Sequence, residues 1–288
     1  MNHLCRTAYP DESEKAAARQ TGAMKSLIAL FLSCTCALSA PAWLADLSPA
    51  KLASHPPIPP SKLGFRLSWK GMVNAGSLSI EFAPKGEKKP GSMVIKSSAS
   101  SEGAAAALFP YKHSYWCEID PTTLASRYFH SIEEDSEEKV VTTNRHVMSR
   151  VTVEEVTTNA ETGAISRQSF LFAYGAARDV FSAMLYIRGQ KLAIGEEHTL
   201  LLLPFKTPYL LKVRVEAKEK HLGRDTLRLS FALRKINRKT LELGTYKKLK
   251  KPVSVWLSDD ADRIPIELRA SAYIGDVRAV LINFSKNP

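Results

Sequence analysis

The sequence lacks any apolar run long enough to cross a bilayer. A membrane-spanning helix needs about 20 consecutive apolar residues, whereas the longest apolar stretch, residues 27–38, is interrupted by Ser33, Cys34, Thr35 and Cys36. Apolar residues nevertheless make up 44% of the 288 residues, and charged residues make up 24%. The missing apolar run argues against a helical membrane protein. The composition argues against a disordered chain and predicts a packed core.

The sequence also lacks the motifs of the common catalytic and metal sites. It contains no H-E-x-x-H, no C-x-x-C, no G-x-S-x-G, and no S-x-x-K near a strand-to-helix turn. Asp259, Asp260 and Asp262 lie close together, but no glycine bend and no distal glutamate follow, so we interpret them as a hairpin turn. The acidic run 133–138 is typical of a solvated loop. We therefore predict no metal, no cofactor and no catalytic residue, which favours a noncatalytic protein.

Cysteine is scarce. The chain has Cys5, Cys34, Cys36 and Cys117, and the first three fall within residues 1–42. A chain without that segment keeps one thiol and can form no internal disulfide. Because Cys117 lies in an apolar-polar alternation, we expect a buried, inert thiol.

Residues 24–42 have the order of a cleavable secretory signal peptide. An internal start at Met24 is followed by Lys25, a short apolar region and the site Ala40-Pro41-Ala42 ahead of Trp43. Residues 1–23 are polar and carry acidic residues, so we interpret them as a start codon assigned too early. The protein is therefore expected to be exported to the periplasm.

A lipid anchor at Cys34 is the alternative form of export. The preceding residues Phe31-Leu32-Ser33 differ from the small-residue pattern of a lipoprotein signal. The soluble form is therefore favoured.

Positive charge exceeds negative charge, with 40 basic against 29 acidic residues and a net charge of +11. A basic exported protein meets anionic lipid headgroups, phosphorylated glycolipids and acidic polymers rather than nucleic acid. The densest basic stretches are residues 234–239 and 247–251. We predict peripheral contact with an anionic surface through Lys247, Lys248, Lys250 and Lys251; a solvated hairpin tip is the alternative.

Most of the chain follows the period of two that is typical of β-strands. Five prolines between residues 45 and 62 predict a linker over 43–62, and about a dozen alternating segments follow it. Short turns between strands favour antiparallel pairing, and a sheet of this size must curl, close or split. We predict a mainly β, single domain over 63–288, built as a large curved antiparallel sheet or open barrel.

One segment, residues 176–190, has helical spacing instead. It predicts one principal helix that lies across the concave face of the sheet and lines any cavity there. The candidate ligand-binding residues are Ser182, Met184, Tyr186 and Arg188. A shorter helix is predicted over 103–109, where four alanines precede Leu108.

Four stretches together resemble a family of exported bacterial proteins. They are Asn74 to Ile80 (NAGSLSI), Tyr115 to Thr123 (YWCEIDPTT), Asp179 to Arg188 (DVFSAMLYIR), and Val255 to Ile266 (VWLSDDADRIPI) with Gly275 after it. In order and spacing they are similar to the DUF3108 family, across roughly residues 62–286. The resemblance implies a fold like that of the envelope lipoprotein carriers, in which a curved sheet surrounds an apolar cavity.

Three functions are open at this point. The first is noncatalytic binding of a lipid or another amphipathic or anionic envelope component in the concave sheet. The second is a structural or assembly factor that contacts an envelope protein or polymer, and the third is an envelope hydrolase. An enclosed cavity favours the first, a flat exposed apolar surface the second, and a cleft with convergent carboxylates the third.

Overall fold

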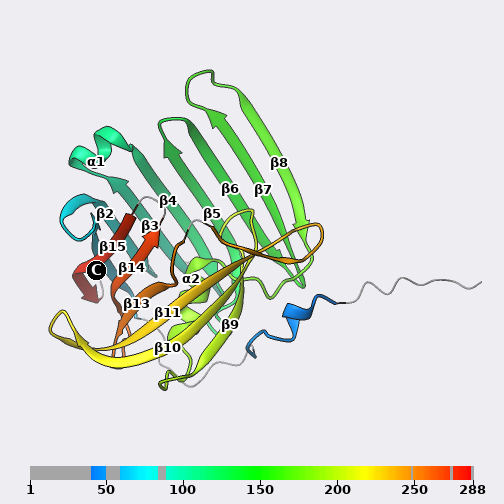
Figure 1. Cartoon of the computed structure of the whole chain (residues 1–288). Coiled ribbons are helices and arrows are strands. Elements are labelled where there is room, and N and C mark those ends of the chain that lie inside the picture. The colour runs from blue at the N-terminus through cyan, green and yellow to red at the C-terminus, as the bar shows by residue number, and fades with distance from the viewer. Residues whose placement is uncertain (1–39, 50–58, 84–88, 248, 273–274, 287–288) are drawn as a thin grey trace, which may run out of the picture. The chain divides into compact units, whose positions relative to one another are not determined.

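The computed structural model describes residues 40–49, 59–83, 89–247, 249–272 and 275–286. These residues belong to one compact unit, Ala40–Pro288. They form a 15-stranded sheet in which neighbouring strands are antiparallel and whose two edges stay unpaired with each other (Figure 1). The predicted early start and most of the predicted signal peptide lie outside the described residues.

The first strand begins near the end of the predicted linker, and the other strands follow along the chain. They are β1 (Ser61–Trp69), β2 (Val73–Phe82), β3 (Met93–Ser101), β4 (Tyr111–Ile119), β5 (Ser126–Asp135), β6 (Glu138–Val147), β7 (Arg150–Asn159), β8 (Ile165–Phe172), β9 (Glu197–Leu202), β10 (Tyr209–His221), β11 (Arg224–Ile236), β12 (Leu243–Thr245), β13 (Val253–Ser258), β14 (Pro265–Ala272) and β15 (Gly275–Lys286).

The order of strands across the sheet runs from the edge strand β8 to the edge strand β9. It is β8-β7-β6-β5-β4-β3-β2-β1-β15-β14-β13-β11-β10-β9, and β12 pairs with β11. Two meanders therefore run outward from the central pair of β1 and β15. The predicted large antiparallel β-sheet is confirmed.

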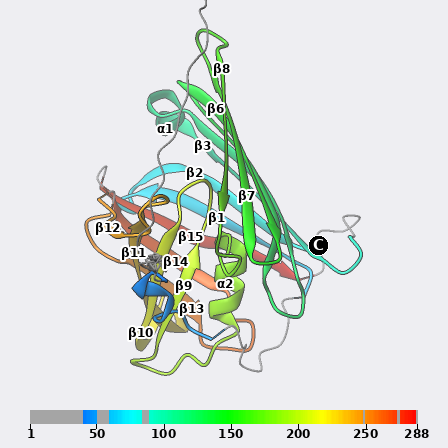
Figure 2. The ribbon, with the colours of Figure 1, turned by 90° about the vertical axis from the view of Figure 1, so that its right-hand side faces the viewer.

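A principal helix, α2 (Val180–Arg188), lies between the two halves of the sheet (Figure 2). Phe181 and Leu185 pack with apolar side chains mainly of β1 to β5, whereas Tyr186 and Ile187 pack with those of β9, β10, β11 and β13. The helix thus fills the concave side of the sheet. The shorter predicted helix is α1 (Gly103–Leu108).

The ends of α2 are set by local chemistry. Asp179 Oδ1 accepts hydrogen bonds from the backbone N–H groups of Phe181 (2.8 Å) and Ser182 (2.9 Å), as a helix N-cap does. The helix begins at residue 180 rather than 176, because Arg178 is extended and forms a parallel β-bridge with Leu202.

The acidic run 133–138 differs from the solvated loop that the sequence predicts. Residues 133–135 end β5, Glu138 begins β6, and only residues 136–137 form the turn. The sequence does not indicate strands here, because the inner face of β5 and β6 carries polar side chains, including Ser131 and Thr142. These two strands therefore lack the alternation of apolar and polar residues.

The start of the predicted linker packs on the domain. Trp43 is 3% exposed and joins a core cluster with Val151, Leu201 and Ile236. Its indole Nε1 donates a hydrogen bond to the carbonyl oxygen of Leu241 at 2.8 Å. The large aromatic side chain of Trp43 thus anchors the start of the segment on the domain. Residues 50–58 of the predicted linker lie outside the described residues.

Two smaller predictions are confirmed. Cys117 is fully buried, and burial raises the pKa of its thiol. Residues 259–262 form the turn between β13 and β14, where Asp260 Oδ1 accepts from the backbone N–H groups of Asp262 and Arg263. In the part of the chain that the structure describes, no helix has the length and apolar character needed to cross a membrane.

Candidate functional site

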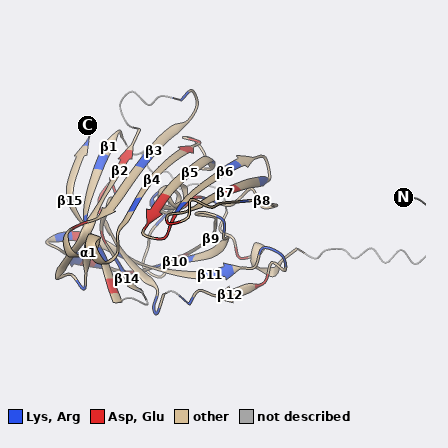
Figure 3. Cartoon of the chain, turned by 90° about the horizontal axis from the view of Figure 1, so that it is seen from above, with Lys and Arg blue, Asp and Glu red and all other residues tan. Residues whose placement is uncertain are grey.

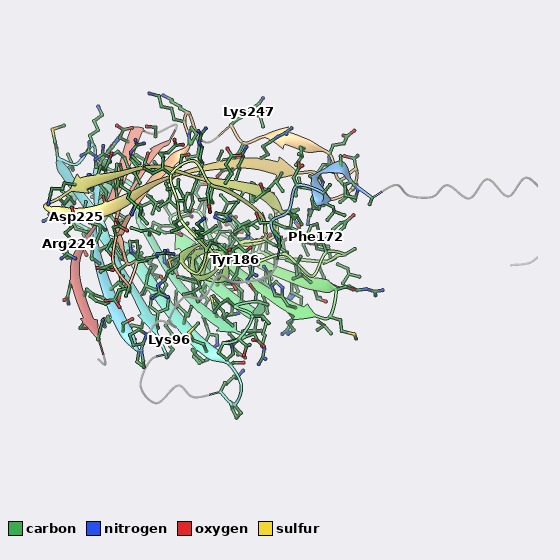
Figure 4. All side chains as sticks on the ribbon, turned by 90° about the horizontal axis from the view of Figure 1, so that it is seen from below. Lys96, Phe172, Tyr186, Arg224, Asp225 and Lys247 are labelled. Carbon is green, nitrogen blue, oxygen red and sulfur yellow. The ribbon has the colours of Figure 1, made fainter. Side chains whose placement is uncertain are left out.

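The candidate residues of α2 lie on different sides of the helix. Ser182 is fully buried, and its hydroxyl donates to the carbonyl oxygen of Leu124 at 2.5 Å and accepts from Arg178 Nη1 at 2.9 Å. Tyr186 lies one turn later on the same side and donates its hydroxyl to the carbonyl oxygen of Pro49. Figure 4 shows Tyr186 between the two halves of the sheet.

Met184 and Arg188 face a second, almost filled space. The cavity beside them holds about 20 Å³, which is about enough for a single water molecule. Arg188 Nε donates to the carbonyl oxygen of Asp262 at 2.6 Å, and Arg263 Nη1 donates to the carbonyl oxygen of Arg188 at 2.8 Å. Burial lowers the pKa of Arg188 to about 10. These contacts tie α2 to the turn after β13, and this side has no room for a lipid chain.

A larger cleft opens on the Tyr186 side of the helix. Its volume is about 370 Å³, within the range of small-molecule sites. Its walls combine apolar side chains with a few hydroxyls and one cation: Leu47, Ser48, Thr122, Thr123, Ala125, Gly175, Ala176, Ala177, Arg178, Tyr186, Thr199, Leu200 and Leu201.

Arg178 is the cation of this cleft. It is 8% exposed, and its guanidinium carbon lies 4.4 Å from the centre of the Tyr186 ring. Its Nη1 also donates to the carbonyl oxygen of Leu124 at 2.5 Å. Within the described residues, neither Nε nor Nη2 of Arg178 has a hydrogen-bond partner.

The electrostatics of this site follow from burial. Desolvation lowers the pKa of Arg178, which still leaves a guanidinium charged at neutral pH. Burial raises the pKa of Asp179, whose Oδ2 has no partner among the described residues. A buried cation with unused donors, set in a partly apolar wall, can hold a carboxylate or phosphate group.

A second polar region lies on the inner face of β3 to β7. Successive strand pairs align Ser97, Tyr115, Ser131, Thr142 and Glu155 in one row. The hydroxyls of Ser131 and Thr142 are buried without a partner in the described structure. The neighbouring row closer to α2 is mainly apolar, with Ile95, Cys117 and Phe129 in register, so the interior changes from apolar to polar within one step of the sheet.

Two tyrosines share a carboxylate above this row. Glu133 Oε1 accepts from the hydroxyls of Tyr111 at 2.6 Å and of Tyr115 at 2.9 Å. Burial raises the pKa of both phenols, and the charge of Glu133 adds to the effect. His113 stacks on Tyr115 with 4.0 Å between ring centres, and burial lowers its pKa to about 4.

The sequence interpretation missed Arg178 and the Glu133 cluster. The signal for the cluster is the alternation Tyr111, His113, Tyr115, in which three side chains of one strand face point the same way. Arg178 precedes the helix, and its meeting with Tyr186 depends on the extended segment before α2.

The predicted basic surface is exposed but not concentrated. Lys247, Lys250 and Lys251 are exposed, and Lys248 lies outside the described residues. Figure 3 shows lysine and arginine on both halves of the sheet rather than on one edge. Contact with an anionic surface therefore stays a prediction.

These features define a class of protein: an open antiparallel sheet that holds a buried helix, with a cleft beside that helix. Among the described residues no group of three or more metal-ligating side chains could hold a metal ion. The chain belongs to the DUF3108 family, described as a protein of unknown function, whose match spans residues 64–282. The resemblance inferred from the sequence is confirmed.

Two solved structures are similar to this chain at low sequence identity. The chain is similar to a β-barrel-like protein of the domain of unknown function DUF1849 from Brucella abortus, with 10% identity, a TM-score of 0.50, and coverage of 80% of this chain and 99% of that one. It is also similar, with 8% identity, a TM-score of 0.30, and coverage of 82% and 100%, to a putative exported protein with a YmcC-like fold from Bacteroides fragilis. The comparison with curated proteins gave no match.

Proposed function

We propose that this protein is a noncatalytic, exported protein of the bacterial envelope that binds an amphipathic anion in the cleft beside α2. The observation that carries the proposal is the buried Arg178, whose Nε and Nη2 have no partner in the described chain and which borders a cleft of about 370 Å³. The order of a signal peptide in residues 24–42 supports export.

The geometry favours the cleft over the centre of the concave sheet. Seven of the nine residues of α2 are buried, and the cavity on its far side holds about 20 Å³. A long lipid chain has no space there. In the cleft, Leu47, Leu200 and Leu201 can contact an apolar tail while Arg178 holds the anionic group.

Calorimetric titration with octyl phosphate tests the proposal, with octyl glucoside as a neutral ligand of the same tail. Ala176 is exposed and borders the cleft, so Ala176→Trp should block it and weaken octyl phosphate binding at least tenfold. Ala160→Trp, in the exposed turn after β7, is the matched control and should bind as the parent does.

Two results would contradict this function. One is equal affinity for octyl phosphate and octyl glucoside, because Arg178 would then contribute nothing. The other is unchanged binding by Ala176→Trp at an unchanged melting temperature.

A further inference from the structure

The outer face of β3, β4 and β5 carries a group of aromatic and charged side chains that the cleft does not use. Cys117 and Phe129 point inward and are fully buried, so their neighbours Trp116, Tyr128 and His130 lie on the opposite face. Trp116 is directly opposite His130 in the pairing of β4 and β5. Figure 4 shows Lys96, opposite Trp116 on β3, on the side of the sheet that faces away from Tyr186.

Two hollows on this face are both bordered by Trp116. One has a volume of about 410 Å³ and is bordered by Ser79, Ser98 and Ser114. The other has a volume of about 460 Å³ and is bordered by Glu118, Tyr128 and His130. Because Trp116 borders both, its ring separates two adjoining subsites on one surface.

The hollow over β5 combines aromatic planes with cations and one buried carboxylate. Lys89, which borders the hollow, has its Nζ 5.9 Å from the centre of the Tyr128 ring. The Arg145 guanidinium lies at the same distance from that ring, and its Nη1 is paired with Glu154 Oε2 at 2.6 Å. Glu118, 8% exposed, accepts from Trp116 Nε1 at 3.3 Å and is paired with Lys89. His130 Nδ1 forms a hydrogen bond with Thr143 Oγ1 at 3.0 Å. This bond does not involve the other ring nitrogen, Nε2.

This chemistry fits a sugar ring that bears negative charge. The apolar C–H face of a pyranose packs on an aromatic ring, serine hydroxyls and a carboxylate exchange hydrogen bonds with its hydroxyls, and lysine and arginine attract its acidic groups. A single-stranded nucleic acid would also stack on aromatic rings. The three serines, however, suit a hydroxyl-rich ligand better than the phosphates and bases of a nucleic acid.

We infer that the outer face around Trp116 and Tyr128 is a second binding site, which takes an acidic saccharide. The inference is independent of the cleft beside α2. Two sugar residues of one chain can occupy the two hollows, one on each side of the indole.

Titration with tri-galacturonate, followed by tryptophan fluorescence, tests the site, with maltotriose as the neutral comparison. Of the four tryptophans in the sequence, Trp43 and Trp256 are buried and Trp69 is 38% exposed. The fluorescence change should vanish in Trp116→Ala and persist in Trp69→Ala. Ala176→Trp, which blocks the cleft, should leave tri-galacturonate binding unchanged when measured by calorimetry.

A surface substitution keeps the test decisive if Trp116→Ala folds poorly. Ser98 is exposed, so Ser98→Glu should leave the melting temperature unchanged and weaken tri-galacturonate binding at least tenfold by charge repulsion. Ser136→Glu, in the exposed turn after β5, is the control. The inference is overturned if maltotriose binds as well as tri-galacturonate, if oligo-deoxythymidylate binds better, or if Ser98→Glu has no effect.

Discussion

The ammonium group of Lys206 lies 2.5 Å from Glu155 Oε1 and connects the loop after β9 to the inner face of β7. The Glu155 side chain is 5% exposed, whereas that of Lys206 is 41% exposed. Phe205, next in the same loop, packs on the rings of Tyr115 and Phe129. The loop thus covers the row of polar side chains inside the sheet and neutralises its carboxylate.

Replacing Lys206 by methionine should lower the free energy of unfolding by about 2 kcal/mol, because it leaves a buried carboxylate unpaired. Urea unfolding at pH 7.5 measures the change. Lys62→Met is the control. The side chains of Lys62 and Glu81 are 45% and 30% exposed, so their ion pair should contribute at most about 0.5 kcal/mol. Equal stability of the Lys206 variant and the parent would show that Glu155 needs no cation.

Stability should fall on acidification through the half-buried His146, whose two ring nitrogens are buried. Burial, and then the charge of Arg178, lowers its pKa from 6.5 to about 4, and neither ring nitrogen has a partner in the described structure. The unfolded chain binds the proton first, so the contribution of neutral His146 is complete above pH 6.5 and is lost between pH 6.5 and about 4. The shift corresponds to at most about 3 kcal/mol.

The variant His146→Leu removes this titration. Its unfolding free energy should change less between pH 7.5 and 4.5 than that of the parent, and it should be no less stable at pH 7.5, because no hydrogen bond is lost. An identical pH slope for both proteins would assign the acid sensitivity to other groups.

Phe181→Ala should destabilise the protein by about 3–5 kcal/mol, because the ring is 5% exposed and packs on the interior of the sheet. Phe109→Ala is the matched control. Phe109 is 64% exposed, and the change should stay within about 0.5 kcal/mol. Thermal and urea unfolding give both values; similar effects would mean that α2 contributes little to the core.

Replacing Lys247, Lys248, Lys250 and Lys251 by glutamine should weaken sedimentation with phosphatidylglycerol vesicles and leave the melting temperature unchanged, because exposed charges contribute little to folding. The control carries the same change of charge at exposed lysines elsewhere, Lys112, Lys139, Lys191 and Lys220. Equal loss in both variants would indicate an effect of net charge alone.

The mature protein should begin near Trp43. N-terminal sequencing of protein isolated from the native host checks this. Peptides from residues 1–23 in that protein, or an acyl group on Cys34, would contradict cleavage after Ala42.

Most strands could be predicted because their inward positions are apolar. Leu63, Phe65, Ile80 and Phe82 alternate with polar residues and are buried in the structure. The strands β5 and β6 could not be recognised in this way, because the inward positions that follow Phe129 are filled by serine, threonine and asparagine.

The helix was predictable, but its site was not. Asp179 and the apolar residues after it follow the rules for an N-cap and an amphipathic stripe. The cleft, in contrast, brings Arg178 together with Ser48 and Thr199, which are far apart in the sequence. The bond from Thr199 N to Ser48 Oγ at 2.9 Å is one of the long-range contacts that no local pattern encodes.

The pairing of β1 with β15, in which Ser61 lies opposite Lys286, sets the order in which the fold can be completed. The meanders β1–β8 and β9–β15 pair strands that are mostly neighbours in the sequence, and such local contacts form quickly. The junction between the two meanders pairs the first strand with the last, so it can form only when both are present. During vectorial synthesis, β1 keeps an open edge until β15 follows. Slow release of the C-terminal strand would therefore prolong an aggregation-prone intermediate, and factors that shield strand edges would matter most at that moment.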